Sequence, residues 1–147
     1  MEIRAVSYNH VLNSEALLKE YGDECSIPEI GAPNPQREAY GRMEQSGLMH
    51  TFGVFEGYEL IGFASILLFV LPHYGKKIAN VESLFLTKAH RKGFAGLKLL
   101  SYIEAWAKAN QCVVMLYNAR AGSRLERLLG CLSRYKRTNS VFLWSVE

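Results

Sequence analysis

The sequence predicts one domain of the mixed α/β (α+β) class. Stretches with strand and helix periodicity follow one another in the order β-α-α-β-β-β-α-β-α-β-β. The 147 residues are enough for one sizeable core, and 49% hydrophobic with 21% charged residues is a globular composition. No repeat or linker-like segment divides the chain, so we expect residues 1–147 to form a single domain.

The first two expected helices lie on either side of a proline-rich loop. A short strand over 3–6 precedes a helical pattern that begins at Asn13-Ser14-Glu15 and ends near Gly22. Three prolines and a glycine make 26–35 a loop. A second helix is expected over 36–45.

Three longer strands follow in the middle of the chain. Strands over 50–56 and 59–71 are joined by a turn at Gly57-Tyr58, and Pro72 ends the second of them. The connection over 72–77 reads as a hairpin, and the strand over 78–86 returns from it.

The strongest helix pattern covers residues 93–110. Its apolar residues recur at i, i+3, i+4 and i+7, and they include Trp106, which we expect in the core. The continuous apolar run over 112–117 is typical of a strand covered on both faces. The remaining expected elements are a helix over 123–132 and a hairpin of strands over 135–137 and 141–145, with Trp144 in the core.

Several classes of protein are disfavoured by composition. Three scattered cysteines and four scattered histidines show neither disulfide nor metal-ligand spacing, so we expect no metal and free thiols in a reducing cytosol. The longest apolar stretch, 61–71, has 11 residues, whereas a membrane span needs about 20. The first residues do not resemble a signal peptide, so we expect a cytoplasmic protein that does not bind membranes.

Charge is unevenly distributed. Residues 1–87 carry 6 basic and 11 acidic side chains, a net charge of −5, whereas residues 88–147 carry 11 and 3, a net charge of +8. A basic half suits a nucleotide phosphate or a nucleic acid, and it can also be a solvated surface. Because basic and aromatic residues do not alternate as in a single-strand platform, nucleic acid is the less favoured partner.

The segment 81–100 has the pattern of an anion site. An apolar strand that contains Glu82 runs into a basic, glycine-bearing turn and then into an amphipathic helix. The N–H groups at a helix start lack intrahelical partners, and Gly93, Ala95 and Gly96 allow close approach of a ligand. Arg91, Lys92 and Lys98 are expected to add positive potential. The alternative is an ordinary strand–helix connection.

These residues resemble the GNAT superfamily of acyl-CoA-dependent N-acetyltransferases. The family signature, Arg/Gln-x-x-Gly-x-Gly/Ala, corresponds here to the run from His90 to Ala95, with His90 in place of Arg or Gln. The run Ile61-Gly62-Phe63-Ala64 looks like the family's third strand. The resemblance implies a mixed, mostly antiparallel central sheet with helices on both faces. The compact size is also similar to that of members encoded by phages.

The resemblance further implies a binding site for acetyl-CoA as acyl donor. Its pyrophosphate would lie on the turn, and its pantetheine arm would pair with the strand before the turn, as a peptide does. Asn118 matches an asparagine that contacts this arm in the family. The full set of expected donor-binding residues is Leu84, Phe85, Leu86, Arg91, Lys92, Gly93, Phe94, Ala95, Gly96, Leu97 and Asn118.

Glu82 is the candidate general base. The acceptor ammonium, with a pKa of about 10.4, must lose a proton before it attacks a thioester, and a carboxylate beside the thioester can accept that proton. A backbone N–H of the same strand would hold the oxyanion. The alternative is a strand-edge glutamate that faces solvent or pairs with Lys76 or Lys77.

The general acid is less clearly indicated. The helix over 123–132 lacks the tyrosine that many family members use, and Ser133-Arg134-Tyr135 stands where a Gly-Phe pair is usual. Tyr135 is the candidate, with Tyr117 or water as alternatives. The departure also leaves open a catalytically idle module that binds CoA or nucleic acid.

The acceptor is expected to be a primary amine of a protein or small molecule. In the family the hairpin between the third and fourth strands borders the acceptor site, which here makes His73 and Tyr74 candidate substrate-binding residues. They can equally be polar turn residues. A homodimer is the state typical of the family.

Overall fold

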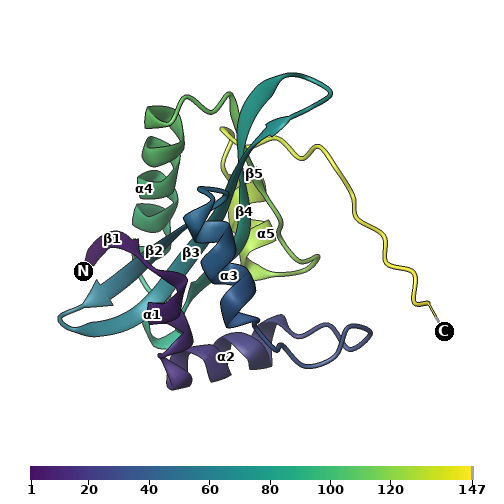
Figure 1. Ribbon diagram of the computed structural model, residues 1–147. Helices are drawn as coiled ribbons and strands as arrows, with labels where there is room; N and C mark the ends of the chain where they lie inside the picture. The colour runs from purple at the N-terminus through teal and green to yellow at the C-terminus, as the bar shows by residue number, and fades with distance from the viewer. Residues whose placement is uncertain (147) are drawn as a thin grey trace. The chain divides into compact units, whose positions relative to one another are not determined.

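The computed structural model describes residues 1–146 in two compact units, which are Met1–Tyr117 and the residues from Asn118 onward. In its described residues the first unit has five strands and four α-helices (Figure 1). Its elements are β1 (Glu2–Val6), α1 (Tyr8–Leu12), α2 (Glu15–Cys25), α3 (Arg37–Gln45), β2 (Met49–Glu56), β3 (Glu59–Leu71), β4 (Lys76–Leu86), a 3₁₀ turn (Lys88–His90), α4 (Ala95–Ala109) and β5 (Val114–Tyr117). The second unit holds α5 (Arg124–Cys131).

The strands form one sheet in the order β1-β2-β3-β4-β5. The first four strands pair antiparallel with their neighbours, and β5 pairs parallel to β4. A parallel neighbour requires a long crossover, which α4 supplies. The predicted mixed, mostly antiparallel sheet is therefore confirmed.

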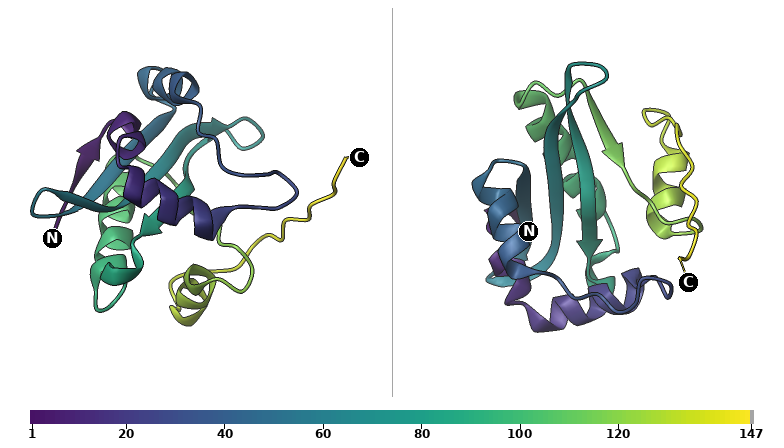
Figure 2. Two further views of the ribbon diagram at one scale, coloured as in Figure 1. Left: turned by 90° about the horizontal axis from the view of Figure 1, so that it is seen from below. Right: turned by 45° about the vertical axis from the view of Figure 1, so that its right-hand side comes forward.

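Helices cover both faces of this sheet (Figure 2). On one face α1 and α2 bury Tyr8 and Leu17 against Phe63 and Phe85, with α3 packed beside them. On the other face α4 buries its apolar stripe, and the Phe52 ring lies 5.2 Å from that of Trp106 between centroids. The helical pattern of 93–110 therefore does what its periodicity predicts, with Trp106 partly buried.

Helix boundaries differ from the predicted ones in three places. The short α1 was not expected, and it begins because the Ser7 hydroxyl accepts the Asn9 N–H. Helix α2 continues past Gly22 to Cys25. Helix α4 begins at Ala95 because Gly93 has φ +82°, a left-handed conformation that a right-handed helix excludes.

Two predictions about the last strands are wrong. The strand expected over 112–117 begins two residues later, at Val114. It is not covered on both faces, since Val114 is 48% exposed. The hairpin over 135–137 and 141–145 is not formed in the described residues, and Trp144, expected in the core, is 83% exposed. A two-stranded hairpin is marginal unless its apolar face is covered, so alternation alone does not specify one.

Candidate active site

A β-bulge in β4 sets Glu82 apart from its neighbours. Ser65 of β3 pairs with Ser83 and Ile66 pairs with Val81, so Glu82 has no residue opposite it. Val81 and Ser83 are buried, at 3% and 4% exposure, whereas Glu82 is exposed. Bulges of this kind re-aim a side chain. Here the bulge presents one carboxylate at the surface of an otherwise buried strand.

The strand edge beyond the bulge is open. The parallel pairing of β4 with β5 ends at Val81 and Tyr117, and none of the strands in the described residues pairs with this edge after that. Since the Thr87 N–H donates to the Ile61 carbonyl at 2.9 Å, antiparallel alternation directs the peptide groups of Phe85 toward β3. The same alternation directs those of Leu84 and Leu86 toward the open edge.

Of the three strand residues predicted to bind the donor, two therefore offer backbone groups at this edge. Leu84 offers an N–H and a carbonyl, and Leu86 offers its N–H. The Leu86 carbonyl already accepts a 2.6 Å hydrogen bond from Arg91 Nε. Phe85 contributes a side chain that is 4% exposed and belongs to the core.

The turn after β4 presents unpaired backbone N–H groups. It contains the 3₁₀ turn and Gly93, and α4 then starts without a side-chain cap at Phe94. Among residues 1–146, the N–H groups of residues 92–97 have no backbone acceptor, and the first such bond joins Lys98 N to the Phe94 carbonyl. The helix dipole adds partial positive charge here, as do the exposed Lys92 and Lys98.

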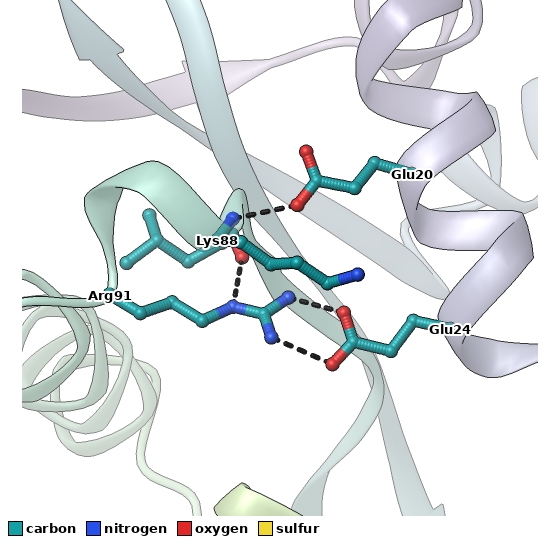
Figure 3. Close-up of polar contacts among 5 residues, drawn as sticks. Glu20, Glu24, Lys88 and Arg91 are labelled. Atoms are coloured by element: carbon teal, nitrogen blue, oxygen red, sulfur yellow. Dashed lines mark hydrogen bonds and ion pairs between the residues drawn. The ribbon is translucent and has the colours of Figure 1, made fainter.

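Two carboxylates on α2 hold the start of this turn (Figure 3). Glu20 Oε1 accepts the Lys88 N–H at 2.7 Å. The two carboxylate oxygens of Glu24 accept hydrogen bonds from the two terminal nitrogens of Arg91, with N–O distances of 2.7 and 2.5 Å. This pairing lowers the pKa of Glu24 and raises that of Arg91. The Arg91 side chain, expected to add positive potential for an anion, is instead paired with Glu24, and it clamps the turn to α2 and β4.

His90 has a related role. Its Nε2 lies 3.0 Å from Glu56 Oε2, and its Nδ1 lies 2.8 Å from Thr87 Oγ1. The residue that departs from the family signature thus links the turn to the end of β2. The roles of Glu20, Glu24 and Glu56 were not predicted from the sequence, because their partners lie 34 to 68 residues away along the chain.

The side chains of Phe94 and Leu97 lie apart from the β4 edge. With Met1 and Ile3 they line an open groove of about 560 Å³ along the first turns of α4. Strand β1 is the opposite edge of the sheet from β5. The backbone N–H groups of these two predicted donor-binding residues are among the unpaired ones of the turn, whereas their side chains line this groove.

Tyrosines of three helices lie on the side of β4 where Ser83 bonds Glu82. Tyr21 Oη lies 3.0 Å from Ser83 Oγ, which in turn lies 2.5 Å from Glu82 Oε2. Burial raises the pKa of Tyr21 to about 12, and burial also raises the pKa values of Tyr8 and Tyr40. The negative charge of Glu82 contributes to all three increases, so the phenols of α1, α2 and α3 lie near its carboxylate.

The predicted substrate-binding pair does not lie beside Glu82. His73 and Tyr74 are exposed in the turn between β3 and β4, and Tyr74 precedes Glu82 by eight residues of mostly extended chain, roughly 26 Å. The alternative partners expected for Glu82, Lys76 and Lys77, precede it by six and five residues of the same strand, roughly 20 and 17 Å. Lys77 Nζ instead donates to the Asn110 carbonyl at 3.1 Å.

The candidates for the acid lie in different places. The Tyr117 hydroxyl donates to Glu104 Oε1 at 3.1 Å. Tyr135 belongs to the second unit, where its hydroxyl accepts from Arg134 at 2.9 Å, and Asn118 belongs to that unit too.

In residues 1–146 no three His, Cys, Asp or Glu side chains gather as metal ligands, and no helix is long and apolar enough to cross a membrane.

Residues 14–130 match the model of the acetyltransferase (GNAT) family. No curated protein sequence matched.

Solved structures with a similar fold extend over nearly the whole chain. An aminoglycoside acetyltransferase, HMB0005, from an uncultured soil metagenomic sample is 18% identical, with a TM-score of 0.72 over 99% of this chain and 97% of that one. A second, meta-AAC0020 in complex with sisomicin from a similar sample, is 10% identical, with a TM-score of 0.76 over 99% and 96%. Ribosomal-protein-alanine N-acetyltransferase from Brucella melitensis biovar Abortus 2308 is 15% identical, with a TM-score of 0.71 over 97% and 98%. At these identities the likeness shows the fold alone.

Proposed function

Since the chain belongs to the acetyltransferase (GNAT) family and is therefore an acyltransferase, we propose that it transfers an acetyl group from acetyl-CoA to a primary amine. The observation that carries this proposal is the bulge in β4. It presents the exposed Glu82 carboxylate where the open strand edge begins, five residues before a turn with unpaired N–H groups.

The donor fits the unpaired backbone groups of this region. The amides of residues 92–97 would bind the pyrophosphate, assisted by Lys92 and Lys98. The amide groups of the pantetheine arm would pair with Leu84 and Leu86 along the open edge. Asn118 stays a predicted contact of the same arm.

Glu82 would act as general base. The acceptor ammonium gives one proton to Glu82, directly or through water, and its nitrogen attacks the thioester carbonyl carbon. The C–N bond forms, an N–H of the β4 edge holds the oxyanion, and the C–S bond then breaks. The remaining ammonium proton reaches the leaving thiolate, so that the products are the amide, the CoA thiol and a proton that Glu82 releases to water.

A dedicated acid is not obligatory, because a thiol with a pKa of about 8.5 is a tolerable leaving group. Tyr135 remains the proposed acid, and water is its alternative. Tyr117 is the weaker candidate, because its proton is already committed to Glu104.

The acceptor is proposed to be a cationic amine on a small molecule or a protein. The structural neighbours include enzymes described as acting on aminoglycosides and on a ribosomal protein. An aminoglycoside and a peptide with a free N-terminus are therefore the first acceptors to test.

A thermal-shift titration with acetyl-CoA, desulfo-CoA and ATP tests the donor site. A ligand at 100 times its Kd stabilises the fold by about 2.7 kcal/mol, which is several degrees for a domain of this size. We expect a clear shift with both CoA compounds and little with ATP. Amine-dependent release of free thiol from acetyl-CoA then tests transfer. No shift with any ligand contradicts the donor site, and a shift without thiol release across the acceptor panel contradicts transfer.

A further inference from the structure

We propose that Ser83 and Tyr21 are positioning residues for Glu82. Their hydroxyls form a chain from α2 through β4 to one carboxylate oxygen, which leaves the other oxygen free to accept the acceptor's proton. The role of Glu82 as base comes from the proposed function, whereas the chain of hydroxyls is a feature of the fold.

The direction of this chain follows from counting protons. Ser83 has one hydroxyl proton, which it donates to Glu82 Oε2 at 2.5 Å. The 3.0 Å bond between Tyr21 and Ser83 must therefore be donated by the tyrosine. When Glu82 takes up a proton on its other oxygen, Oε2 becomes the carbonyl oxygen of the carboxyl group and can still accept from Ser83. The chain thus holds the carboxyl group in both protonation states.

The bulge explains why Glu82 needs such a support. A residue without a ladder partner, and with an exposed side chain, has several accessible rotamers. Ser83, in contrast, is 4% exposed and has Ser65 opposite it in register, so its Cβ is held by the sheet. Fixing one carboxylate oxygen to a buried serine removes rotamers that would point the base away from the thioester.

Tyr21 is itself held in place. Its ring makes edge contacts with Phe63 and Phe85, with centroid distances of 5.3 and 5.4 Å. One residue before it and three residues after it on α2, Glu20 and Glu24 bind the turn of the donor site. Helix α2 therefore supports both halves of the candidate site.

The chemistry of Tyr21 suits positioning and not proton transfer to the leaving group. Its pKa of about 12 keeps it protonated as a donor at neutral pH. A thiolate whose conjugate acid has a pKa of about 8.5 is too weak a base to remove this proton readily. The rings of the other two tyrosines, Tyr8 from α1 and Tyr40 from α3, stack on each other with their centroids 3.8 Å apart.

Tyr21→Phe and Ser83→Ala test the proposal against matched controls. Ser83→Ala should lower kcat about tenfold, the effect of one hydrogen bond to a charged group, and Tyr21→Phe should lower it a few-fold, the effect of a bond between neutral groups. Neither should change the KM for acetyl-CoA much. The double variant should lose no more than Ser83→Ala alone, because the two hydroxyls act in one chain.

Tyr40→Phe and Ser65→Ala are the controls. In the described residues Tyr40 makes no hydrogen bond to Ser83 or Glu82, and Ser65 Oγ is buried with no hydrogen-bond partner. Both variants should keep the kcat and the KM for acetyl-CoA of the parent protein. Equal losses in Tyr21→Phe and Tyr40→Phe at matched stability would overturn the proposal, since the cluster would then be only structural.

A readout that does not need turnover separates this proposal from the proposed function. Crystal structures of the variants should show the Glu82 carboxylate in more than one rotamer in Tyr21→Phe and Ser83→Ala, and in the parent rotamer in both controls, because only the first two break the chain of hydroxyls that holds it. This pattern supports positioning even if no amine is acetylated. The parent rotamer in all four variants overturns it, even if the protein proves to be an active acetyltransferase.

Discussion

The two halves of the candidate site are held together by different chemistry, although α2 supports both. The donor half is clamped by ion pairs and charge-assisted bonds, in which Glu20 and Glu24 bind Lys88 N and Arg91. The half around Glu82 is held by the neutral hydroxyls of Ser83 and Tyr21, and the Tyr21 ring packs against the ring of Phe63.

The difference follows from what each half must present. The ion pair of Arg91 with Glu24 shapes the turn and leaves the backbone N–H groups of the turn for an anion. The charge of Arg91 thus supports the structure of the turn and is balanced by Glu24. A second charged group beside Glu82 would instead change its proton affinity, whereas hydroxyls fix its position without adding net charge. Acid should therefore loosen the donor half first, and loss of single hydroxyls should affect the half around Glu82.

The largest effect is expected when the charge of Glu82 is removed. Glu82→Gln keeps the size of the side chain and an oxygen that can accept from Ser83, but it cannot take up a proton. We expect kcat to fall about 10²- to 10⁴-fold, the usual range for loss of a general base. The thermal shift with acetyl-CoA should remain. Unchanged turnover would show that the base lies elsewhere.

Backbone strain in the turn should produce the next largest effect. Gly93→Ala places a side chain at φ +82°, with no heavy atom within 4 Å of the new Cβ, so its cost is conformational. We expect a loss of stability of about 1–2 kcal/mol. The KM for acetyl-CoA should rise with little change in kcat at saturation.

Gly96→Ala is the matched control for that substitution. Its Cβ also meets open space, but Gly96 lies in the first turn of α4 with an ordinary helical φ. We expect it to stabilise the fold by up to about 1 kcal/mol. Urea unfolding of both variants measures the contrast, and equal destabilisation would mean that the left-handed conformation of Gly93 is not what shapes the turn.

The ionic clamp should give the smallest effect. Glu24 is 37% exposed, so water screens its pair with Arg91, and Glu24→Gln should cost at most about 1 kcal/mol at pH 7. The KM for acetyl-CoA should rise a few-fold while kcat is kept. Glu38→Gln, which breaks a 3.8 Å pair with Arg42 at 92% exposure, should change neither quantity.

The sign of the pH dependence distinguishes the clamp from a general loss of packing. Because the pKa of Glu24 is lowered in the fold, its stabilisation is complete above the ordinary carboxyl pKa of about 4.3 and is lost as pH falls through the folded value. The parent protein and Glu24→Gln should therefore have different urea midpoints at pH 7 and converging midpoints near pH 3. A constant difference would assign the effect to packing.

Much of the fold was accessible from local patterns. The bounds of β3 were predicted as observed, and β2 and β4 within two residues, because β-branched and aromatic runs between turn residues are local signals. The turn around Gly93 was recognised in the same way. The last hairpin was not, because alternation near residues 135–145 does not say whether anything covers the strands.

Local sequence patterns were enough to predict the order of elements, the glycine turn before α4 and a carboxylate in the strand that runs into this turn. The complete fold was needed to show that Glu82 lies on a bulge, that Arg91 pairs with Glu24 and that Tyr21 reaches Glu82 through Ser83. The preference of a segment for helix, strand or turn depends mainly on residues close together in the sequence. Register and side-chain partners are chosen across separations of 62 and 67 residues, where packing of the whole sheet and its helices selects among many polar groups.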